Sequence, residues 1–131
     1  MTKESRNMEQ SNTSRLWQEC RNAFLATIKG YYGTIDDRGG ELTFSAKNRF
    51  IRRYNDDDGW HESEKTVPTT IAIDCKRGEV AISAEEKTCE IAGGCFVGVD
   101  NLTSFTKTLS EMLRRWKFKE KKEKYEQMTL F

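Results

Sequence analysis

TTIAIDCKRGEVAIS, residues 69–83, is the stretch of sequence that decides the fold. Residues 69–75 are rich in β-branched side chains, which favours a strand. Lys76-Arg77-Gly78 is a turn signal, and residues 79–83 form a second extended run. The two runs are the clearest antiparallel hairpin in the chain, so the centre of the protein is predicted to be a β-sheet.

Extended segments continue on both sides of this hairpin. On the N-terminal side, Tyr31, Tyr32 and Ile35 predict a short strand, with turns at 36–40 and 55–59. Between these turns, residues 42–44 and 49–54 form either two strands around a turn at 46–48 or one long bulged strand. A polar loop follows, and Pro68 is expected at a strand start or edge, where it removes no central hydrogen bond. On the C-terminal side, residues 89–91 and 95–99 are extended and are separated by Gly93-Gly94.

Two helices are predicted to flank the strands. The first begins near Ser14 and ends before Gly30, and its buried face follows helical spacing: Leu16, Trp17, Cys20, Ala23, Phe24, Thr27 and Ile28. The second begins near Asp100, a favourable N-cap, and its apolar stripe is Leu102, Phe105, Leu109, Met112, Leu113 and Trp116. Beyond Trp116 the stripe stops, so we expect the helix to continue as a solvated arm.

These elements predict an α+β fold: an N-terminal helix, an antiparallel β-meander of five or six strands, and a long C-terminal helix with a protruding tail. A lipocalin-like small barrel is an alternative arrangement. We expect residues 1–13 to be a disordered lead-in, residues 14–116 to form one globular domain, and residues 117–131 to be a basic arm and binding peptide. A chain of 131 residues is long enough for one such core.

Charge and cysteine usage limit the functional classes. The net charge is only +1, but residues 114–124 hold seven basic residues against Glu120 and Glu123, so this segment carries +5 and the rest −4. No apolar run is long enough to span a membrane, and no signal peptide is evident, so we expect a cytoplasmic protein with no membrane partner. The four cysteines lack the spacing of a zinc site, and we expect reduced thiols.

The last five residues, Gln127-Met128-Thr129-Leu130-Phe131, carry the sharpest functional signal. They resemble the peptide, usually Gln-Leu-Ser/Asp-Leu-Phe, by which many bacterial replication and repair proteins grip the sliding clamp. Gln127, Leu130 and Phe131 fall on the strongest positions of that motif, Met128 replaces leucine, and Thr129 stands where serine or aspartate is commoner. The resemblance implies that Leu130 and Phe131 enter a hydrophobic pocket of the clamp. The alternative is that both side chains fold back onto the domain.

Two basic segments are candidates for contact with nucleic acid. The first has seven cations, interleaved with aromatic residues that stack on bases: Arg114, Arg115, Lys117, Lys119, Lys121, Lys122 and Lys124. The alternative here is an ordinary solvated helix. The second is the strand 49–54, in which Phe50, Arg52 and Tyr54 share one face and Arg49, Ile51 and Arg53 the other. A sheet face with an arginine between two aromatic residues suits single-stranded nucleic acid, but core aromatics beside snorkelling arginines give the same pattern.

Catalysis has little support in the sequence. His61 has no evident partner, and turn chemistry explains Asp56-Asp57-Asp58. We therefore expect no enzyme, no cofactor and no metal. The predicted function is a replication or repair accessory protein, or a phage or mobile-element protein, that binds the bacterial DNA polymerase sliding clamp. Single-stranded or clamp-associated DNA is a further candidate partner. The alternatives are a single-stranded nucleic-acid-binding module and a protein–protein adaptor that uses the tail for self-association.

Overall fold

The described part of the chain has an α+β fold with two helices and a five-stranded antiparallel sheet. The computed structural model describes residues 3–76, 78–88 and 93–121, with the backbone alone for residues 3–13. The elements follow in the order α1 (Lys3–Ile28), β1 (Thr34–Asp37), β2 (Glu41–Asp56), β3 (Gly59–Asp74), β4 (Val80–Glu86), β5 (Gly94–Val99) and α2 (Leu102–Arg115). The predicted helices and meander are thus confirmed, whereas the long C-terminal helix is not.

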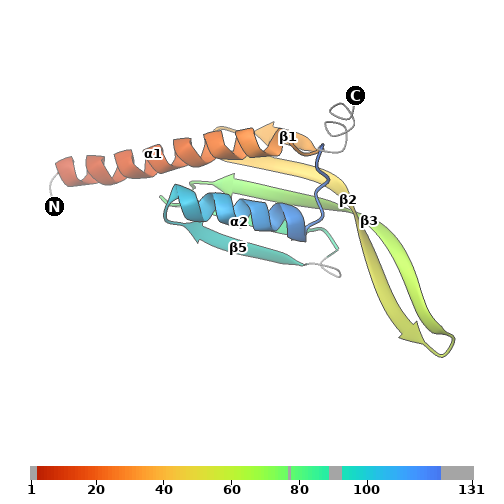
Figure 1. Cartoon of the computed structure of the whole chain (residues 1–131). Helices are drawn as coiled ribbons and strands as arrows, with labels where there is room; N and C mark the ends of the chain where they lie inside the picture. Colours follow the sequence, from red (N-terminus) through yellow and green to blue (C-terminus); the bar gives the residue numbers. More distant parts are fainter. Residues whose placement is uncertain (1–2, 77, 89–92, 122–131) are drawn as a thin grey trace, which may run out of the picture.

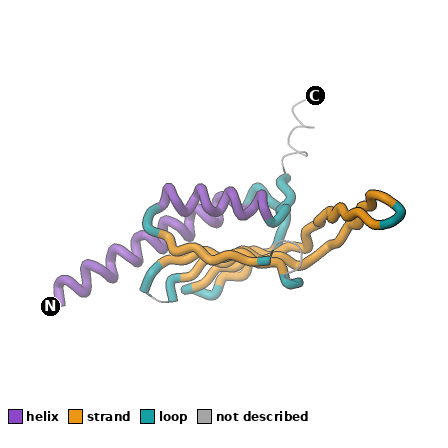
Figure 2. Tube along the Cα trace, turned by 90° about the horizontal axis from the view of Figure 1, so that it is seen from below, coloured by secondary structure: helices purple, strands orange, loops and turns teal. Residues whose placement is uncertain are grey.

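Each strand of the sheet pairs with its neighbour in sequence, in the order β1-β2-β3-β4-β5. The hairpin predicted at 69–83 is present, with Ile73 opposite Ile82 and Ala72 opposite Ser83. The sheet is open, and both helices lie on one of its faces (Figure 1, Figure 2). The other face includes polar side chains such as Ser45 and Thr70, whose hydroxyl groups lie 3.0 Å apart.

The core fills the space between the helices and the covered face of the sheet. Alternate residues of β2, β3 and β4 point into it, because successive side chains of a strand lie on opposite faces. The apolar stripes predicted for the two helices meet these strands. The largest apolar side chains that are fully buried are Trp116, Phe24, Phe44, Phe105, Ile28, Leu42, Ile71, Ile73, Ile82, Leu109 and Leu113.

The start of each helix differs from the sequence prediction. α1 begins at Lys3 and not at Ser14, and its N-terminal part extends past the sheet (Figure 1). α2 has Asn101 as its N-cap and not Asp100, because the Asn101 side chain accepts a 2.8 Å hydrogen bond from the Ser104 N–H. That bond satisfies one of the unpaired N–H groups at a helix start.

The strands β2 and β3 are longer than predicted. β2 is continuous, without a turn at 46–48, and its register with β3 runs without a bulge from Glu41 opposite Asp74 to Asp56 opposite Gly59. The predicted polar loop after the turn at 55–59 is therefore part of β3. Pro68 lies within β3, at the level where β4 ends, and its carbonyl accepts a 3.0 Å hydrogen bond from the Lys87 N–H.

The prediction that the second helix continues as a solvated arm is wrong for the described residues 116–121. Lys117 has a φ of 61°, and the N–H groups of Lys117 and Phe118 bond back to the carbonyls of Arg114 and Leu113. This pair of bonds is a Schellman motif, which ends a helix and reverses the chain. The motif is held from the sheet by Asn48 of β2, whose side-chain amide donates a 2.8 Å hydrogen bond to the carbonyl of Trp116.

After this reversal, residues 117–121, which we call the return segment, lie against the end of α1. The Tyr32 N–H bonds to the Lys119 carbonyl at 2.9 Å, and the Lys121 N–H bonds to the Gly30 carbonyl at 2.8 Å. Phe118 is buried and stacks on Phe44, with ring centroids 5.3 Å apart. The chain reverses after Trp116 because Phe118 then completes the core, and a straight continuation of α2 would keep Phe118 out of it.

Candidate functional site

The end of the β2–β3 hairpin projects from the body as a two-stranded ribbon, residues 47–68 (Figure 1). β4 pairs with β3 only from Thr69 to Asp74, so beyond Thr69 the hairpin has no third strand beside it among the described residues. No described helix covers it either (Figure 2). A two-stranded ribbon is at best marginally stable by itself, so the outer part of this projection adds little to the stability of the fold.

One face of the ribbon continues the covered face of the sheet, and it holds the predicted residues Phe50, Arg52 and Tyr54. Phe50 is only 4% exposed, so this ring belongs to the core and cannot stack on a base. The Tyr54 ring stacks on the ring of His61, directly opposite it in β3, with centroids 5.2 Å apart. Arg52 lies between Phe50 and Tyr54 on this face of β2 and is exposed, and it has no ion pair within the described part of the chain. The predicted stacking face is therefore reduced to Arg52 and Tyr54.

The opposite face of the ribbon holds Arg49 and Arg53, and each is paired across the strands. Arg49 bonds to Glu64, a contact that lowers the pKa of that carboxyl group, and Arg53 Nε lies 2.9 Å from Glu62 Oε1. Both pairs are exposed, and such pairs contribute little to stability. Arginines in such pairs are less available to phosphate groups than Arg52.

Two large apolar side chains share this second face with the ion pairs. Ile51 is 64% exposed and Trp60 is 76% exposed. Sequence reasoning missed Trp60 because it placed residues 60–68 in a polar loop. The alternation of Trp60 with His61 and Glu62 could have placed it on a strand face, given the Asp-Gly turn just before it.

The tip of the ribbon is acidic. Asp56, Asp57 and Asp58 close the turn, in which the Asp58 N–H bonds to the Asp56 side chain at 2.8 Å. His61 Nε2 also lies 2.8 Å from Asp56 Oδ1. The whole ribbon holds five basic residues (Lys47, Arg49, Arg52, Arg53, Lys65) and five acidic residues (Asp56, Asp57, Asp58, Glu62, Glu64), so it has no net charge. A nucleic acid would meet favourable charge along the ribbon stem and repulsion at the tip.

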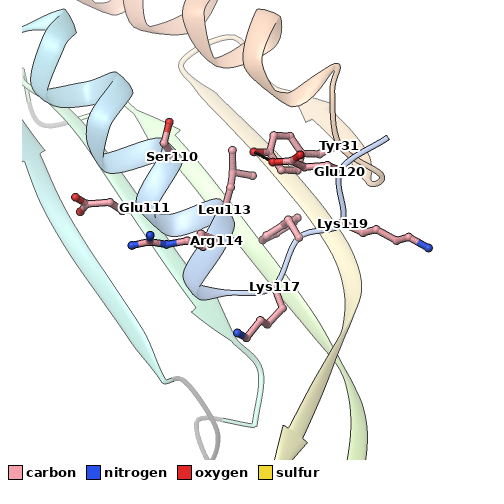
Figure 3. A pocket seen from close by; sticks show the side chains of 9 residues that line it. Tyr31, Ser110, Glu111, Leu113, Arg114, Lys117, Lys119 and Glu120 are labelled. Atoms are coloured by element: carbon pink, nitrogen blue, oxygen red, sulfur yellow. Dashed lines mark hydrogen bonds between the residues drawn. The ribbon is translucent and has the colours of Figure 1, made fainter. Parts of the chain in front are cut away.

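The return segment and α2 enclose a groove of about 790 Å³ (Figure 3). Its lining includes Glu111 and Arg114 of α2, Lys117 and Lys119 of the return segment, and Tyr31. The Tyr31 hydroxyl donates a 3.2 Å hydrogen bond to Glu120, and burial together with this carboxylate raises the tyrosine pKa. The lining mixes both signs of charge, which gives the groove no clear preference for an anion.

The predicted basic arm is distributed over the end of α2 and the return segment. Arg114 and Arg115 lie in the last turn of α2, where cations stabilise the helix dipole. Arg115 lies over the Trp116 ring at 4.9 Å, and Lys119 and Lys121 lie over the exposed Tyr32 ring at 5.9 and 5.6 Å. Tyr32 is thus part of this basic surface. The sequence pattern predicts it only as a strand residue. Lys122, Lys124 and the peptide residues Gln127, Met128, Leu130 and Phe131 lie outside the described residues.

We compared the chain with models of known protein families, with curated proteins and with solved structures. None of them matches. The function must therefore be argued from the surfaces just described and from the peptide 127–131.

Two features of the described residues bear on reactive chemistry. No group of three or more His, Cys, Asp or Glu side chains in that part of the chain is arranged to hold a metal ion. Cys20 is buried, and burial raises the pKa of its thiol to about 11, so it is protonated at neutral pH and not a nucleophile. Neither described helix is long and apolar enough to cross a membrane.

Proposed function

We propose that this protein is a non-enzymatic accessory factor of DNA replication or repair, or a phage or mobile-element protein, that binds the bacterial sliding clamp through residues 127–131. The observation that carries this proposal is the match of Gln127, Leu130 and Phe131 to the strongest positions of the clamp-binding peptide. α2 ends at Arg115 and the return segment bonds to Gly30 and Tyr32, so the described residues form no straight helical arm toward the peptide.

The return segment instead gives the peptide a short tether. Lys121 is bonded to Gly30, and five residues separate it from Gln127. The six Cα–Cα steps from Lys121 to Gln127 span at most about 22 Å when fully extended. A clamp that held residues 127–131 would therefore lie close to the basic surface formed by Arg115, Lys119 and Lys121, and DNA inside the clamp would be near these cations.

The expected affinity follows from the two apolar side chains. Leu130 and Phe131 would each contribute roughly 1.5–3 kcal/mol if fully buried in the clamp. Gln127 would fix the register through hydrogen bonds of its amide. Ordering the tether costs part of this free energy, so we expect micromolar binding, near −8 kcal/mol.

The test uses the full chain on a biosensor that carries immobilised bacterial sliding clamp. Replacing Leu130 and Phe131 together by alanine, or deleting residues 128–131, is expected to abolish capture. Thr129→Ser is the matched control, because serine is commoner at that position, and it is expected to bind as well as the starting protein. Capture that survives the double substitution would contradict the proposal. So would a fall of several degrees in the melting temperature of the deletion variant, because the peptide would then belong to the core.

A second candidate is binding of single-stranded nucleic acid along the ribbon face that holds Arg52 and Tyr54. The specific observation is that Arg52 is exposed and unpaired among the described residues, whereas Arg53 on the other face is paired with Glu62. Fluorescence polarisation with a labelled oligonucleotide at low salt separates the two faces. We expect Arg52→Glu to weaken binding by at least about tenfold and Arg53→Glu to weaken it much less, and the signal should fall as salt rises. Equal effects, or no binding by the starting protein, would dispose of this candidate.

A further inference from the structure

The strand β5 forms an outer edge of the sheet, with β4 on one side and no described strand on the other (Figure 1). The Glu86 N–H bonds to the Gly93 carbonyl at 2.9 Å, which fixes the alternation along the β4–β5 ladder. Hydrogen-bonded and non-bonded pairs alternate in an antiparallel ladder. The backbone groups of Cys95, Val97 and Val99 therefore point toward β4, and those of Gly94, Phe96 and Gly98 point outward from the edge.

The side chains of β5 do nothing to block this edge. The strand reads Gly-Cys-Phe-Val-Gly-Val and contains no charge and no proline. Phe96 is 61% exposed and Val97 is 38% exposed, on opposite faces of the sheet. Sheet proteins normally protect their edges with charges, prolines, bulges or very short strands, because an open edge pairs with other chains.

The other edge of the same sheet has this protection. β1 is four residues long and contains Asp36 and Asp37. These carboxylates are held at the edge by ion pairs with Arg38 and Arg21. If β1 paired with β1 of another copy, the like charges of the two strands would lie close together and disfavour the contact. One edge is thus closed to pairing and the other is left open.

We propose that β5 pairs antiparallel with β5 of a second copy of this chain, so that one continuous sheet runs through a two-fold dimer. A two-fold axis brings the same patch of each copy together, so the patch must be complementary to itself. An uncharged antiparallel edge meets this requirement, since its outward N–H and C=O groups match under the rotation and no like charges within the strand meet. The inference does not depend on residues 127–131 and is independent of the proposed clamp binding.

The outward positions also fit a close approach of two backbones. With Val97 opposite Val97, Phe96 of each copy lies opposite Gly98 of the other, and both residues have outward backbone groups. A β-carbon at Gly98 would meet no atom within 4 Å in the single chain, so there is open space over this glycine. The Phe96 ring of the partner would fill that space, because an aromatic side chain commonly covers a glycine on the neighbouring strand.

Sedimentation velocity of the full chain over a range of concentrations tests the dimer. We expect a reversible dimer with a dissociation constant on the order of 10 µM. Phe96→Lys puts a charge at the edge, and Gly98→Pro removes an outward N–H group that makes no bond to β4. Both variants are expected to weaken the dimer at least tenfold. Ile51→Lys is the matched control, because Ile51 is similarly exposed on the ribbon and its replacement should leave the dimer unchanged.

Three outcomes would overturn the inference. The first is a starting protein that stays monomeric at concentrations well above the expected dissociation constant. The second is a dimer that persists in both β5 variants while their circular dichroism spectra show the native fold. The third is a dimer that disappears when residues 128–131 are deleted, because self-association would then use the peptide and not the sheet edge. Loss of clamp capture in that deletion variant with the dimer retained would leave both proposals standing separately.

Discussion

Lys117 shows how one residue changes the shape of the C-terminal region. A helix that ends in a Schellman motif usually has glycine at the left-handed position, because a β-carbon there is strained. Here that position is lysine, so the sequence offers no glycine or asparagine to signal the helix end. The signal that exists is Phe118, one residue further on, which packs in the core beside Leu113 as the motif requires.

Replacing Lys117 by glycine is therefore expected to stabilise the protein. The substitution removes the left-handed strain, which is about 1–2 kcal/mol, but it also makes the unfolded chain more flexible, so we expect a net gain of up to about 1 kcal/mol. Lys119→Gly is the control, since Lys119 does not have a positive φ and its side chain lies over Tyr32. Urea unfolding should show a higher midpoint for the first variant and a lower one for the second. Equal losses of stability would show that the turn at Lys117 is not strained.

The elements that bury apolar side chains are those that the sequence could predict. The spacing of Phe105, Leu109 and Met112 identifies the buried face of α2, and all three are buried. The hairpin at 69–83 is likewise identified by its β-branched residues and turn. Its side chains alternate between the core and the open face, which is the pattern that hydrophobic periodicity detects.

The ribbon could not be predicted in the same way, because beyond Asn48, Phe50 and Val67 at its base it buries almost nothing. In the second half of the hairpin, residues 61–66 are His-Glu-Ser-Glu-Lys-Thr, and every one of them from Glu62 onward is exposed. Polar segments of this kind have no periodicity, and they are extended here only because they pair with β2. The same limit applies to the candidate site. The sequence predicts Arg49, Arg52 and Arg53 as site residues, but it does not predict that Glu62 and Glu64 pair with two of them, because both glutamates lie in the predicted loop.

At the scale of the whole molecule, the packed body is distinct from the surfaces that project from it. The core lies between the two helices and the covered face of the sheet, and it includes Phe50 and Val67 at the base of the ribbon. The outer ribbon, residues 51–66, lies outside the core, and the peptide 127–131 lies beyond the described residues. Functional surfaces that contribute little to the core can change without loss of the fold.

This division predicts that the outer ribbon can be removed without unfolding the body. Replacing residues 53–62 by Asn-Gly keeps Arg52 opposite Ser63 as the pair that closes a two-residue hairpin. The removed residues are mostly exposed, so we expect a loss of no more than about 1 kcal/mol, or a few degrees in melting temperature. Clamp capture and the β5 dimer should be unchanged, whereas binding of any partner that contacts Trp60 should be lost. A variant that no longer unfolds cooperatively in calorimetry would contradict this prediction, because the ribbon would then be part of the body's folding unit.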